Sequence, residues 1–442
     1  MNKEIYHVKR PDKIRSDASV TVTVPGSKSI TNRALLIAAM ADGTSCLKGC
    51  LTSDDARHFI ECLKTLGFPA EEVSDGALGS NISIKGFDGK IPEKKAEIYV
   101  GSAGTAARFL VAMLAFSDGE YIVNSSEQMK KRPMQPLIDA LRNAGAKVDC
   151  LESEGHFPLK IKGASKENIP DSFTVNIDKS SQFLSALLIA AGTLGKKAEI
   201  KVEGSHGLSY VDLTAKMMKS FGVHAEKLDD DHTRYVFSGN DSYGSIDYEI
   251  EPDMSAAAYF YALAAVLGIT VTVKGVHGNM LQGDTDFIGV LAEMGCTAEI
   301  TDEKITVTGP KQLKGGFNVD MSAFSDQALT LAAIAPFADA PITISGIEHI
   351  RLQECDRITA IVKNLASLGV KTDERRDSVT IYPSPVHGGD IETFDDHRVA
   401  MSFALTGLRA DGVNILDPFC CKKTFAEYFD VLDKVLDEIE DK

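Results

Sequence analysis

The sequence lacks the cysteine spacings of a zinc site: none of its eight cysteines belongs to a CxxC pair. It also lacks an apolar run of membrane-spanning length, because Gly, Asp or Lys interrupts each candidate. The first thirteen residues are polar, so we expect no signal peptide. These absences favour free thiols in a cytoplasmic protein that has no membrane partner.

Positive charge is in deficit as well. The chain has 47 Lys and Arg against 63 Asp and Glu, which gives a formal net charge of -16. This balance argues against nucleic acid or an anionic membrane as the main partner, although a small anionic substrate responds only to local charge. No low-complexity linker divides the 442 residues, and this length favours two large domains.

What the sequence does contain is an internal repeat. An apolar helix pattern recurs six times at intervals of 72 to 76 residues, and a short β-rich stretch follows each copy. Amphipathic helix patterns closed by a glycine lie between the copies. We expect the first helix of each repeat to be buried and the second to keep one polar face. Six units of this length favour closed globular domains over an open array. The apolar copies end at Gly43, Gly119, Gly195, Gly268, Ala340 and Gly412.

The first repeat begins with PGSKSITNR, which looks like a phosphate-binding turn. A nucleotide P-loop needs a glycine five residues before an unbroken Gly-Lys pair, and Ser27 splits the pair here. Lys28 and Ser29 nevertheless lie at a predicted helix N-terminus, where the helix dipole and unpaired N–H groups favour an anion. The competing interpretation is that Ser29 or Thr31 is only an N-cap.

The six helix starts can be compared with one another. Hydroxyls and carboxylates at these positions are explained by capping alone, but cations at the positive end of a helix dipole are unfavourable without an anion beside them. We therefore predict a site that binds anions at converging helix N-termini. The residues concerned are Lys28, Ser29, Arg33, Gly104, Thr105, Arg108, Ser180, Ser181, Gln182, Asp253, Asp326, Asp396, His397 and Arg398.

Segments spread in order over nearly the whole chain resemble the 5-enolpyruvylshikimate-3-phosphate (EPSP) synthase family. They include PGSKSITNRAL, GSAGTAARFL, SSQFLSALL, EPDMSAAAYF, DDHRVAMSFAL and DPFCCKKTFAEYF. The resemblance implies an α/β (α+β) fold of two domains, each built from three βαβαββ repeats of about 75 residues. It implies one domain at residues 26–251, a second at 1–25 plus 252–442, and a substrate cleft between them.

The resemblance also implies an activity. The enolpyruvyl group of phosphoenolpyruvate is transferred to the 5-hydroxyl of shikimate 3-phosphate. The hydroxyl adds to phosphoenolpyruvate, and inorganic phosphate is then eliminated. The reaction is a step of chorismate and aromatic amino-acid biosynthesis. It implies no metal ion and no organic cofactor. We further expect a cytoplasmic monomer that is a target of glyphosate, which competes with phosphoenolpyruvate in this family.

Three alternatives have different sequence signatures. The related transferase that acts on UDP-N-acetylglucosamine carries a reactive cysteine in a loop, and the matching segment here, SSEQMKKRPM, has none. An inactive paralogue that only binds an anion would not need the catalytic residues named below. A fold relative acting on an RNA end phosphate would need basic and aromatic patches, which this acidic chain does not supply.

The resemblance assigns roles to individual residues. Asp326 is the implied base for the 5-hydroxyl, and Glu354 and Lys28 manage proton transfer at the methylene carbon and the leaving phosphate. The planar guanidinium of arginine suits carboxylate and phosphate because it binds two oxygens at once. Residues expected to bind shikimate 3-phosphate are Lys28, Ser29, Arg33, Ser180, Ser181, Gln182, Tyr210, Asp326, His349 and Gln353. Residues expected to bind phosphoenolpyruvate are Lys28, Ser102, Gly104, Arg132, Gln182, Arg357, Arg398 and Lys423.

Simpler interpretations compete with some of these roles. Asp326 is of a residue type that often caps helices, and Glu354 is spaced to pair with Arg357 three residues further along the chain. His397 and Asp55 are left outside the catalytic set, because they can act by orienting their neighbours.

Four positions depart from the family pattern. Gln353 stands where the family usually has Lys, and Gly207 stands where many members have Ser. Asn is frequent at the positions of Ser102 and His349. Because Gln353 and Gly207 fall where the family binds the shikimate phosphate, we expect weaker binding of that substrate.

Overall fold

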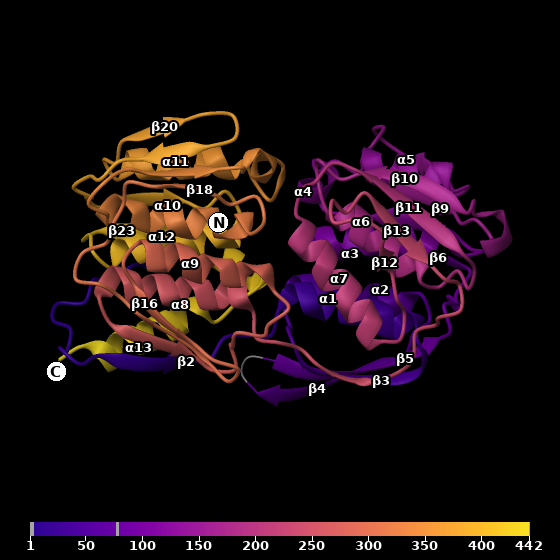
Figure 1. Ribbon diagram of the computed structural model, residues 1–442, viewed down its shortest axis with the longest axis horizontal. Helices are drawn as coiled ribbons and strands as arrows, with labels where there is room; N and C mark the ends of the chain where they lie inside the picture. Colours follow the sequence, from indigo (N-terminus) through magenta and orange to yellow (C-terminus); the bar gives the residue numbers. More distant parts are fainter. Residues whose placement is uncertain (1–3, 77–78, 442) are drawn as a thin grey trace. The chain divides into compact units, whose positions relative to one another are not determined.

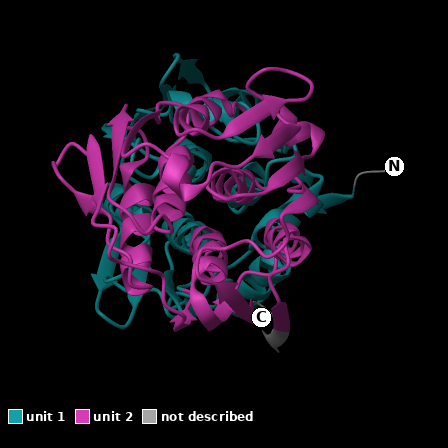
Figure 2. Ribbon diagram, turned by 90° about the vertical axis from the view of Figure 1, so that its right-hand side faces the viewer, with its two compact units in different colours: residues 1–25, 251–442 teal, residues 26–250 magenta. Residues whose placement is uncertain are grey.

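In the computed structural model, which describes residues 4–76 and 79–441, the chain divides into two compact units. Unit 1 comprises residues 1–25 and 251–442, and unit 2 comprises residues 26–250 (Figure 2). The N-terminal segment therefore belongs to the same unit as the C-terminal half of the chain.

Unit 2 contains three repeats of the predicted type (Figure 1). The first helices of these repeats are buried almost all round, and in α3 every residue is buried. The second helices bury one face only. In α5, for example, Leu137 and Leu141 lie on the buried face. This contrast confirms the pattern predicted from the sequence. The helices of this unit are α1 (Lys28–Met40), α2 (Asp54–Thr65), α3 (Gly104–Ala115), α4 (Glu127–Lys130), α5 (Gln135–Asn143), α6 (Gln182–Ala191) and α7 (Leu208–Ser220).

The sheets of unit 2 share one topology. In each, the first two neighbouring strands are parallel and the remaining pairs are antiparallel. The first sheet contains, in order, β14 (Asp247–Glu249), β3 (Asp42–Cys50), β5 (Gly79–Phe87) and β4 (Ala70–Gly76). The second contains β6 (Lys95–Tyr99), β7 (Glu120–Asn124), β9 (Leu159–Lys162) and β8 (Lys147–Cys150). The third contains β10 (Ser172–Asn176), β11 (Ala198–Glu203), β13 (Arg234–Phe237) and β12 (Glu226–Lys227). In the second and third sheets a βαβ crossover followed by a hairpin produces this order, whereas in the first sheet the parallel strand β14 comes from the end of the unit.

Unit 1 repeats the same plan with help from the N-terminus. β2 (Ser19–Val22) pairs in parallel with β15, and β1 (Ile5–His7) pairs antiparallel with β23. The N-terminal segment thus completes the sheets of the fourth and sixth repeats. The helices are α8 (Met254–Leu267), α9 (Phe287–Glu293), α10 (Ala328–Ile334), α11 (Arg357–Ser367), α12 (His397–Gly407) and α13 (Tyr428–Ile439).

The other strands of unit 1 complete two four-stranded sheets and, with β1, a three-stranded sheet of β1, β23 and β22. They are β15 (Thr270–Val273), β16 (Thr297–Ile300), β17 (Ile305–Thr308), β18 (Asn318–Asp320), β19 (Ile342–Ser345), β20 (Thr372–Glu374), β21 (Val379–Ile381), β22 (Gly389–Glu392) and β23 (Val413–Leu416). Short 3-10 turns precede several helices, and two of them, η2 (Gly283–Asp286) and η3 (Ser325–Gln327), carry acidic residues of the candidate site.

Local details explain where the helices begin and end. Ser27 caps α1 by accepting from the Ile30 N–H, so the competing interpretation of Ser29 or Thr31 as the N-cap misplaced the cap by two or four residues. The glycines that close the amphipathic helices, such as Gly67 and Gly145, take positive φ, as predicted. None of the helices in the described part of the chain combines the length and the apolar character that a membrane crossing requires.

Candidate active site

The start of α1 places a lysine beside a buried carboxylate. Lys28 is the first residue of the helix, and its Nζ lies 3.8 Å from Asp55 Oδ2 in the first turn of α2. Asp55 is only 3% exposed. The carboxylate offsets the unfavourable position of a cation at the positive end of the α1 dipole and fixes the direction of the lysine.

Arg33, one turn further along α1, is buried among neutral acceptors. Its Nε donates to Thr214 Oγ1 (2.7 Å), and its terminal nitrogens donate to the Ser29 carbonyl (3.0 Å) and the Tyr210 carbonyl (3.1 Å). Burial lowers the pKa of the guanidinium to about 10. Arg33 therefore ties Ser29 and Tyr210, two predicted binding residues on α1 and α7, to one rigid group.

Two arginines converge on the N-terminus of α3. Arg108 Nη1 donates to the Gly104 carbonyl (2.9 Å) and to Gln182 Oε1 (3.1 Å) on α6. A Cβ added to Gly104 would lie 2.6 Å from Nη1 of Arg108 and 2.6 Å from Nη1 of Arg132. The absence of a side chain at Gly104 thus lets both guanidinium groups approach the first turn of the helix, where N–H groups point outward.

Gly207 takes a left-handed backbone conformation at the start of α7. It takes φ of +62°, and a Cβ added there would lie 2.6 Å from Ser181 Oγ. A serine at this position would be strained by its φ and would collide with Ser181. The departure from the family pattern therefore has a structural reason: the glycine makes room for the Ser181 hydroxyl.

Unit 1 contains a buried network of arginines and carboxylates centred on Arg357. The Arg357 guanidinium contacts Asp326 Oδ1 (2.9 Å), Glu354 Oε2 (3.1 Å) and Asp396 Oδ2 (2.8 Å). Burial opposes its charge, but the three carboxylates outweigh that effect and raise the pKa of Arg357 above its usual value. Arg357 therefore positions both predicted catalytic carboxylates, Asp326 and Glu354.

Two further cations complete this network. Arg398 Nη2 lies 2.8 Å from Asp326 Oδ2, and Lys423 Nζ lies 3.1 Å from Glu354 Oε1. Each oxygen of Asp326 thus faces a different arginine. Three cations and three carboxylates give these six groups no net formal charge, so the cations are held in place before any anion binds.

Gln353 and His349 lie at the edge of this network. Gln353 Oε1 accepts a short hydrogen bond from Arg357 Nη1. His349 Nε2 lies 2.7 Å from the hydroxyl of Ser325, the residue before Asp326. Arg351, two residues before Gln353, is bound to Asp356 (3.0 Å) and Glu374 (2.8 Å).

Comparison with known proteins gives this arrangement a family. Residues 13–432 match the family model described as EPSP synthase (3-phosphoshikimate 1-carboxyvinyltransferase). The chain belongs to the EPSP synthase family. It is 42% identical over 410 residues to a 3-phosphoshikimate 1-carboxyvinyltransferase of Nostoc punctiforme. The aligned region covers 92% of this chain and 94% of the relative. A Halalkalibacterium halodurans protein named 3-phosphoshikimate 1-carboxyvinyltransferase 2 is 41% identical, over 94% of this chain and 91% of its own length.

The fold agrees with that of solved EPSP synthases. A structure of EPSP synthase from Acinetobacter baumannii superposes with a TM-score of 0.79 at 24% identity and covers 98% of each chain. The predicted two-domain repeat fold of this EPSP synthase family member is therefore confirmed.

The residues that the EPSP synthase resemblance singled out fall into two groups. In unit 2, those at or near helix N-termini are Lys28, Ser29, Arg33, Ser102, Gly104, Ser180, Ser181, Gln182 and Tyr210, and Arg132 follows α4. In unit 1, ion pairs and hydrogen bonds join Asp326, Glu354, Arg357, Arg398, Lys423 and Gln353, and His349 reaches the same turn through Ser325.

Sequence reasoning missed one acidic residue near the candidate carboxylate Asp326 of this EPSP synthase family member. Asp284 in η2 accepts from Gln327 Nε2 (3.0 Å), and Gln327 directly follows Asp326. Burial and then the charge of Asp326 raise the pKa of Asp284 to about 6. Asp284 lies outside the repeated helix starts, so the periodic pattern does not draw attention to it.

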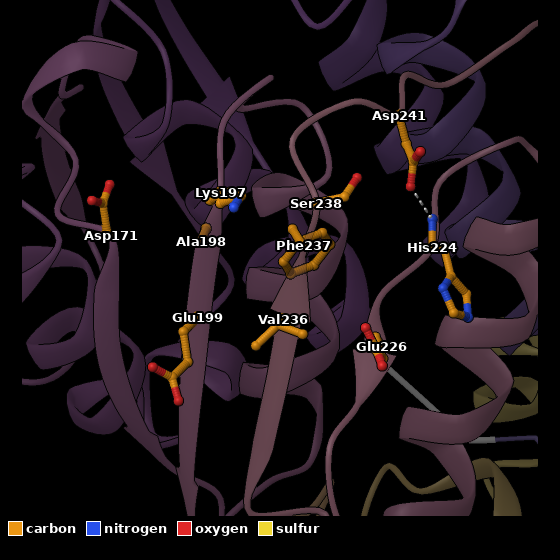
Figure 3. A pocket seen from close by; sticks show the side chains of 10 residues that line it. All are labelled: Asp171, Lys197, Ala198, Glu199, His224, Glu226, Val236, Phe237, Ser238 and Asp241. Atoms are coloured by element: carbon orange, nitrogen blue, oxygen red, sulfur yellow. Dashed lines mark hydrogen bonds between the residues drawn. The ribbon is translucent and has the colours of Figure 1, made fainter.

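A pocket elsewhere in unit 2 contains none of these residues. It has a volume of about 370 Å³ and lies along β11 and β13 (Figure 3). Its charged lining is mainly acidic, with Asp171, Glu199, Glu226 and Asp241 against Lys197. Asp241 accepts from the backbone N–H of His224 (3.2 Å). Four carboxylates make this pocket unsuitable for a phosphorylated substrate.

Proposed function

We propose that this chain transfers the enolpyruvyl group of phosphoenolpyruvate to the 5-hydroxyl of shikimate 3-phosphate and releases inorganic phosphate. The observation that carries the proposal is the network in which Arg357 holds Asp326 and Glu354, within a chain of the EPSP synthase family. The reaction needs one group that takes a proton from a hydroxyl and others that exchange a proton with the methylene carbon, and two separate carboxylates fit this need.

Asp326 is proposed to bind the shikimate ring and accept the 5-hydroxyl proton. Both of its oxygens face guanidinium groups, Arg357 at 2.9 Å and Arg398 at 2.8 Å, and these hold the carboxylate in one orientation. A fixed base loses little entropy when the hydroxyl arrives, which favours attack on C2 of phosphoenolpyruvate.

Glu354 and Lys28 are proposed to move the proton at the methylene carbon and to assist the leaving phosphate. The side chain of Glu354 is 9% exposed and lies between Arg357 and Lys423. Lys28 and Lys423 each have a carboxylate partner, Asp55 and Glu354 respectively. An ammonium has three N–H donors and carries a positive charge, so both lysines suit the phosphate and carboxylate of phosphoenolpyruvate.

The shikimate phosphate is proposed to bind at the helix starts of unit 2. Ser29, Ser180 and Ser181 offer hydroxyl donors there, and the N-termini of α1 and α6 add N–H groups and a favourable dipole. Arg33 supports this site by fixing Ser29 and Tyr210. Arg132, Gly104, Gln182 and Ser102 are proposed to serve phosphoenolpyruvate.

The proposal is tested by phosphate release from phosphoenolpyruvate with either shikimate 3-phosphate or UDP-N-acetylglucosamine as acceptor. We expect release with the first acceptor only. Asp326→Asn should lower kcat by about 100-fold or more, since general base catalysis contributes ~10²–10⁴-fold. Asp373→Asn, an exposed change on β20, is the matched control and should be neutral. Release with the second acceptor, or with none, would reject the assignment.

A further inference from the structure

Arg398 has a second set of contacts besides its ion pair with Asp326. Nη2 reaches Asp326 at 2.8 Å, and the same guanidinium donates to the hydroxyls of Tyr259 (3.5 Å) and Ser255 (3.4 Å). Ser255 and Tyr259 are one turn apart on α8, so their side chains share a face of that helix. All three side chains are buried, and Tyr259 is 1% exposed.

A small cavity lies beside these groups. Its volume is about 10 Å³, which is the space that one water molecule requires. Arg398, Tyr259, Ser255 and Thr424 contribute to its lining. Thr424 directly follows Lys423, and within residues 4–76 and 79–441 its buried hydroxyl has no hydrogen-bond partner. The cavity is therefore lined by Arg398, which is expected to bind phosphoenolpyruvate, and by the residue next to Lys423.

The hydrogen-bonding capacity of the lining matches one water molecule. Arginine only donates, so the oxygens of Tyr259 and Ser255 are the acceptors and their hydroxyl hydrogens remain to be donated. Thr424 adds a further hydroxyl that can donate or accept. A water molecule accepts two hydrogen bonds and donates two, and buried waters make about three. Three hydroxyls in contact with one cavity satisfy that number.

We propose that the hydroxyls of Tyr259, Ser255 and Thr424, together with one bound water in the cavity they line, position the Arg398 guanidinium for phosphoenolpyruvate. This inference rests on the proposed function. The Tyr259 and Ser255 hydroxyls and the Asp326 carboxylate contact the same guanidinium and together hold it in one orientation. Tyr259 acts through Arg398 and is a positioning residue.

The hydroxyl of Tyr259 can be removed without loss of the ring. Its ring packs edge-on against Tyr428 with centroids 5.7 Å apart, and phenylalanine keeps that contact. Tyr261 provides the matched control, because it is buried on the same helix and its hydroxyl donates to the Ile305 carbonyl, away from Arg398. Tyr259→Phe and Tyr261→Phe thus remove the same atom at two positions of α8.

The test is steady-state kinetics of both tyrosine variants and of Thr424→Val. We expect Tyr259→Phe and Thr424→Val to raise the KM for phosphoenolpyruvate by about 3- to 10-fold, the net size of one ordinary hydrogen bond. The KM for shikimate 3-phosphate should change by less than about 2-fold, and Tyr261→Phe should change neither KM. Thermal unfolding of each variant separates a general loss of packing from this selective effect.

Two results would overturn the inference. One is an unchanged KM for phosphoenolpyruvate in Tyr259→Phe, and the other is an equal rise of both KM values in Tyr259→Phe and Tyr261→Phe. Failure of the proposed function looks different, because the unmodified chain itself would then release no phosphate with shikimate 3-phosphate.

Discussion

Arg33 and Arg357 are both fully buried arginines, and their surroundings have opposite effects on their charge. Arg33 has neutral acceptors such as Thr214 and the Tyr210 carbonyl, and burial lowers its pKa to about 10. Arg357 has three carboxylate partners, which raise its pKa. At pH 7 both stay charged, but Arg33 carries charge that nearby groups have not cancelled, which suits a position beside an anion site.

Replacement of Gln353 by lysine tests the departure from the family pattern. A neutral amide binds phosphate less strongly than an ammonium by about 1–2 kcal/mol, or roughly 5- to 30-fold. We predict that Gln353→Lys lowers the KM for shikimate 3-phosphate. The KM for phosphoenolpyruvate should hardly change, because Arg357 keeps its three carboxylate contacts when it loses the Gln353 oxygen.

Steady-state kinetics decide this point, with Gln353→Met as the control that removes the amide without adding charge. An unchanged or higher KM for shikimate 3-phosphate in Gln353→Lys would mean that another group already binds that phosphate.

A methyl group at Gly104 should disturb phosphoenolpyruvate and glyphosate together. It would lie 2.6 Å from Nη1 of both Arg108 and Arg132, so both guanidinium groups must move. We predict that Gly104→Ala raises the KM for phosphoenolpyruvate by about 10-fold, since a misplacement of ~1 Å can cost up to ~100-fold. The inhibition constant of glyphosate, expected near or below that KM in the unmodified chain, should rise as well.

Gly289→Ala is the matched control for this experiment. Gly289 lies within α9, and an added Cβ there meets no atom within 4 Å. Inhibition kinetics of both variants would contradict the account if Gly104→Ala bound phosphoenolpyruvate and glyphosate as the control does.

At the scale of elements, the turns η2 and η3 are joined by the hydrogen bond from Gln327 to Asp284. The folded-state pKa of Asp284 is about 6, against an ordinary value of 3.8, because burial disfavours its charge. A raised carboxyl pKa favours folding below the unfolded-state value, and this contribution is lost as the pH rises from about 4 through 6.

Asp284→Asn should therefore change the pH dependence of stability. The amide oxygen can still accept from Gln327 but cannot ionise. We predict that the variant gains stability relative to the unmodified chain between pH 4 and pH 7, by up to about 3 kcal/mol. Denaturant unfolding at both pH values measures this difference. The same difference at pH 4 and pH 7 would contradict the account, and the exposed change Asp339→Asn provides the control.

The element scale also shows what the sequence could and could not predict. The six repeats and their buried first helices could be predicted from the sequence, because apolar periodicity and closing glycines reflect local packing. Individual hydrogen bonds could not be predicted from the sequence. Nothing in the local pattern distinguishes Ser27 from Ser29 as the cap of α1, or shows that the Gln353 oxygen turns toward Arg357.

At the scale of the whole molecule, two compact units carry different parts of the proposed chemistry. The candidate carboxylates Asp326 and Glu354 belong to unit 1, whereas Lys28 and the hydroxyl-rich helix starts belong to unit 2. Residues far apart in sequence share a unit because β1 and β2 complete sheets of the C-terminal half. The local sequence pattern does not indicate such long-range pairing, and only the family resemblance predicted that the N-terminal segment joins the C-terminal half.

Cations from both units are proposed to bind phosphoenolpyruvate, which leads to a test by double substitution. We predict that Arg132→Ala in unit 2 and Lys423→Ala in unit 1 each raise the KM for phosphoenolpyruvate by about 10-fold or more. The two effects should not be additive, because groups that hold one ligand are coupled. Kinetics of the single and double variants measure the coupling, and strictly additive effects would argue against a shared ligand.

The most direct test of the central claim is identification of the products by phosphorus and proton magnetic resonance. The unmodified chain is incubated with phosphoenolpyruvate and shikimate 3-phosphate. The account predicts equal amounts of inorganic phosphate and of a carboxyvinyl ether at the 5-oxygen of shikimate 3-phosphate, with neither product in Asp326→Asn above about 1% of the normal rate. Phosphate without the ether, or an ether at another oxygen, would contradict it.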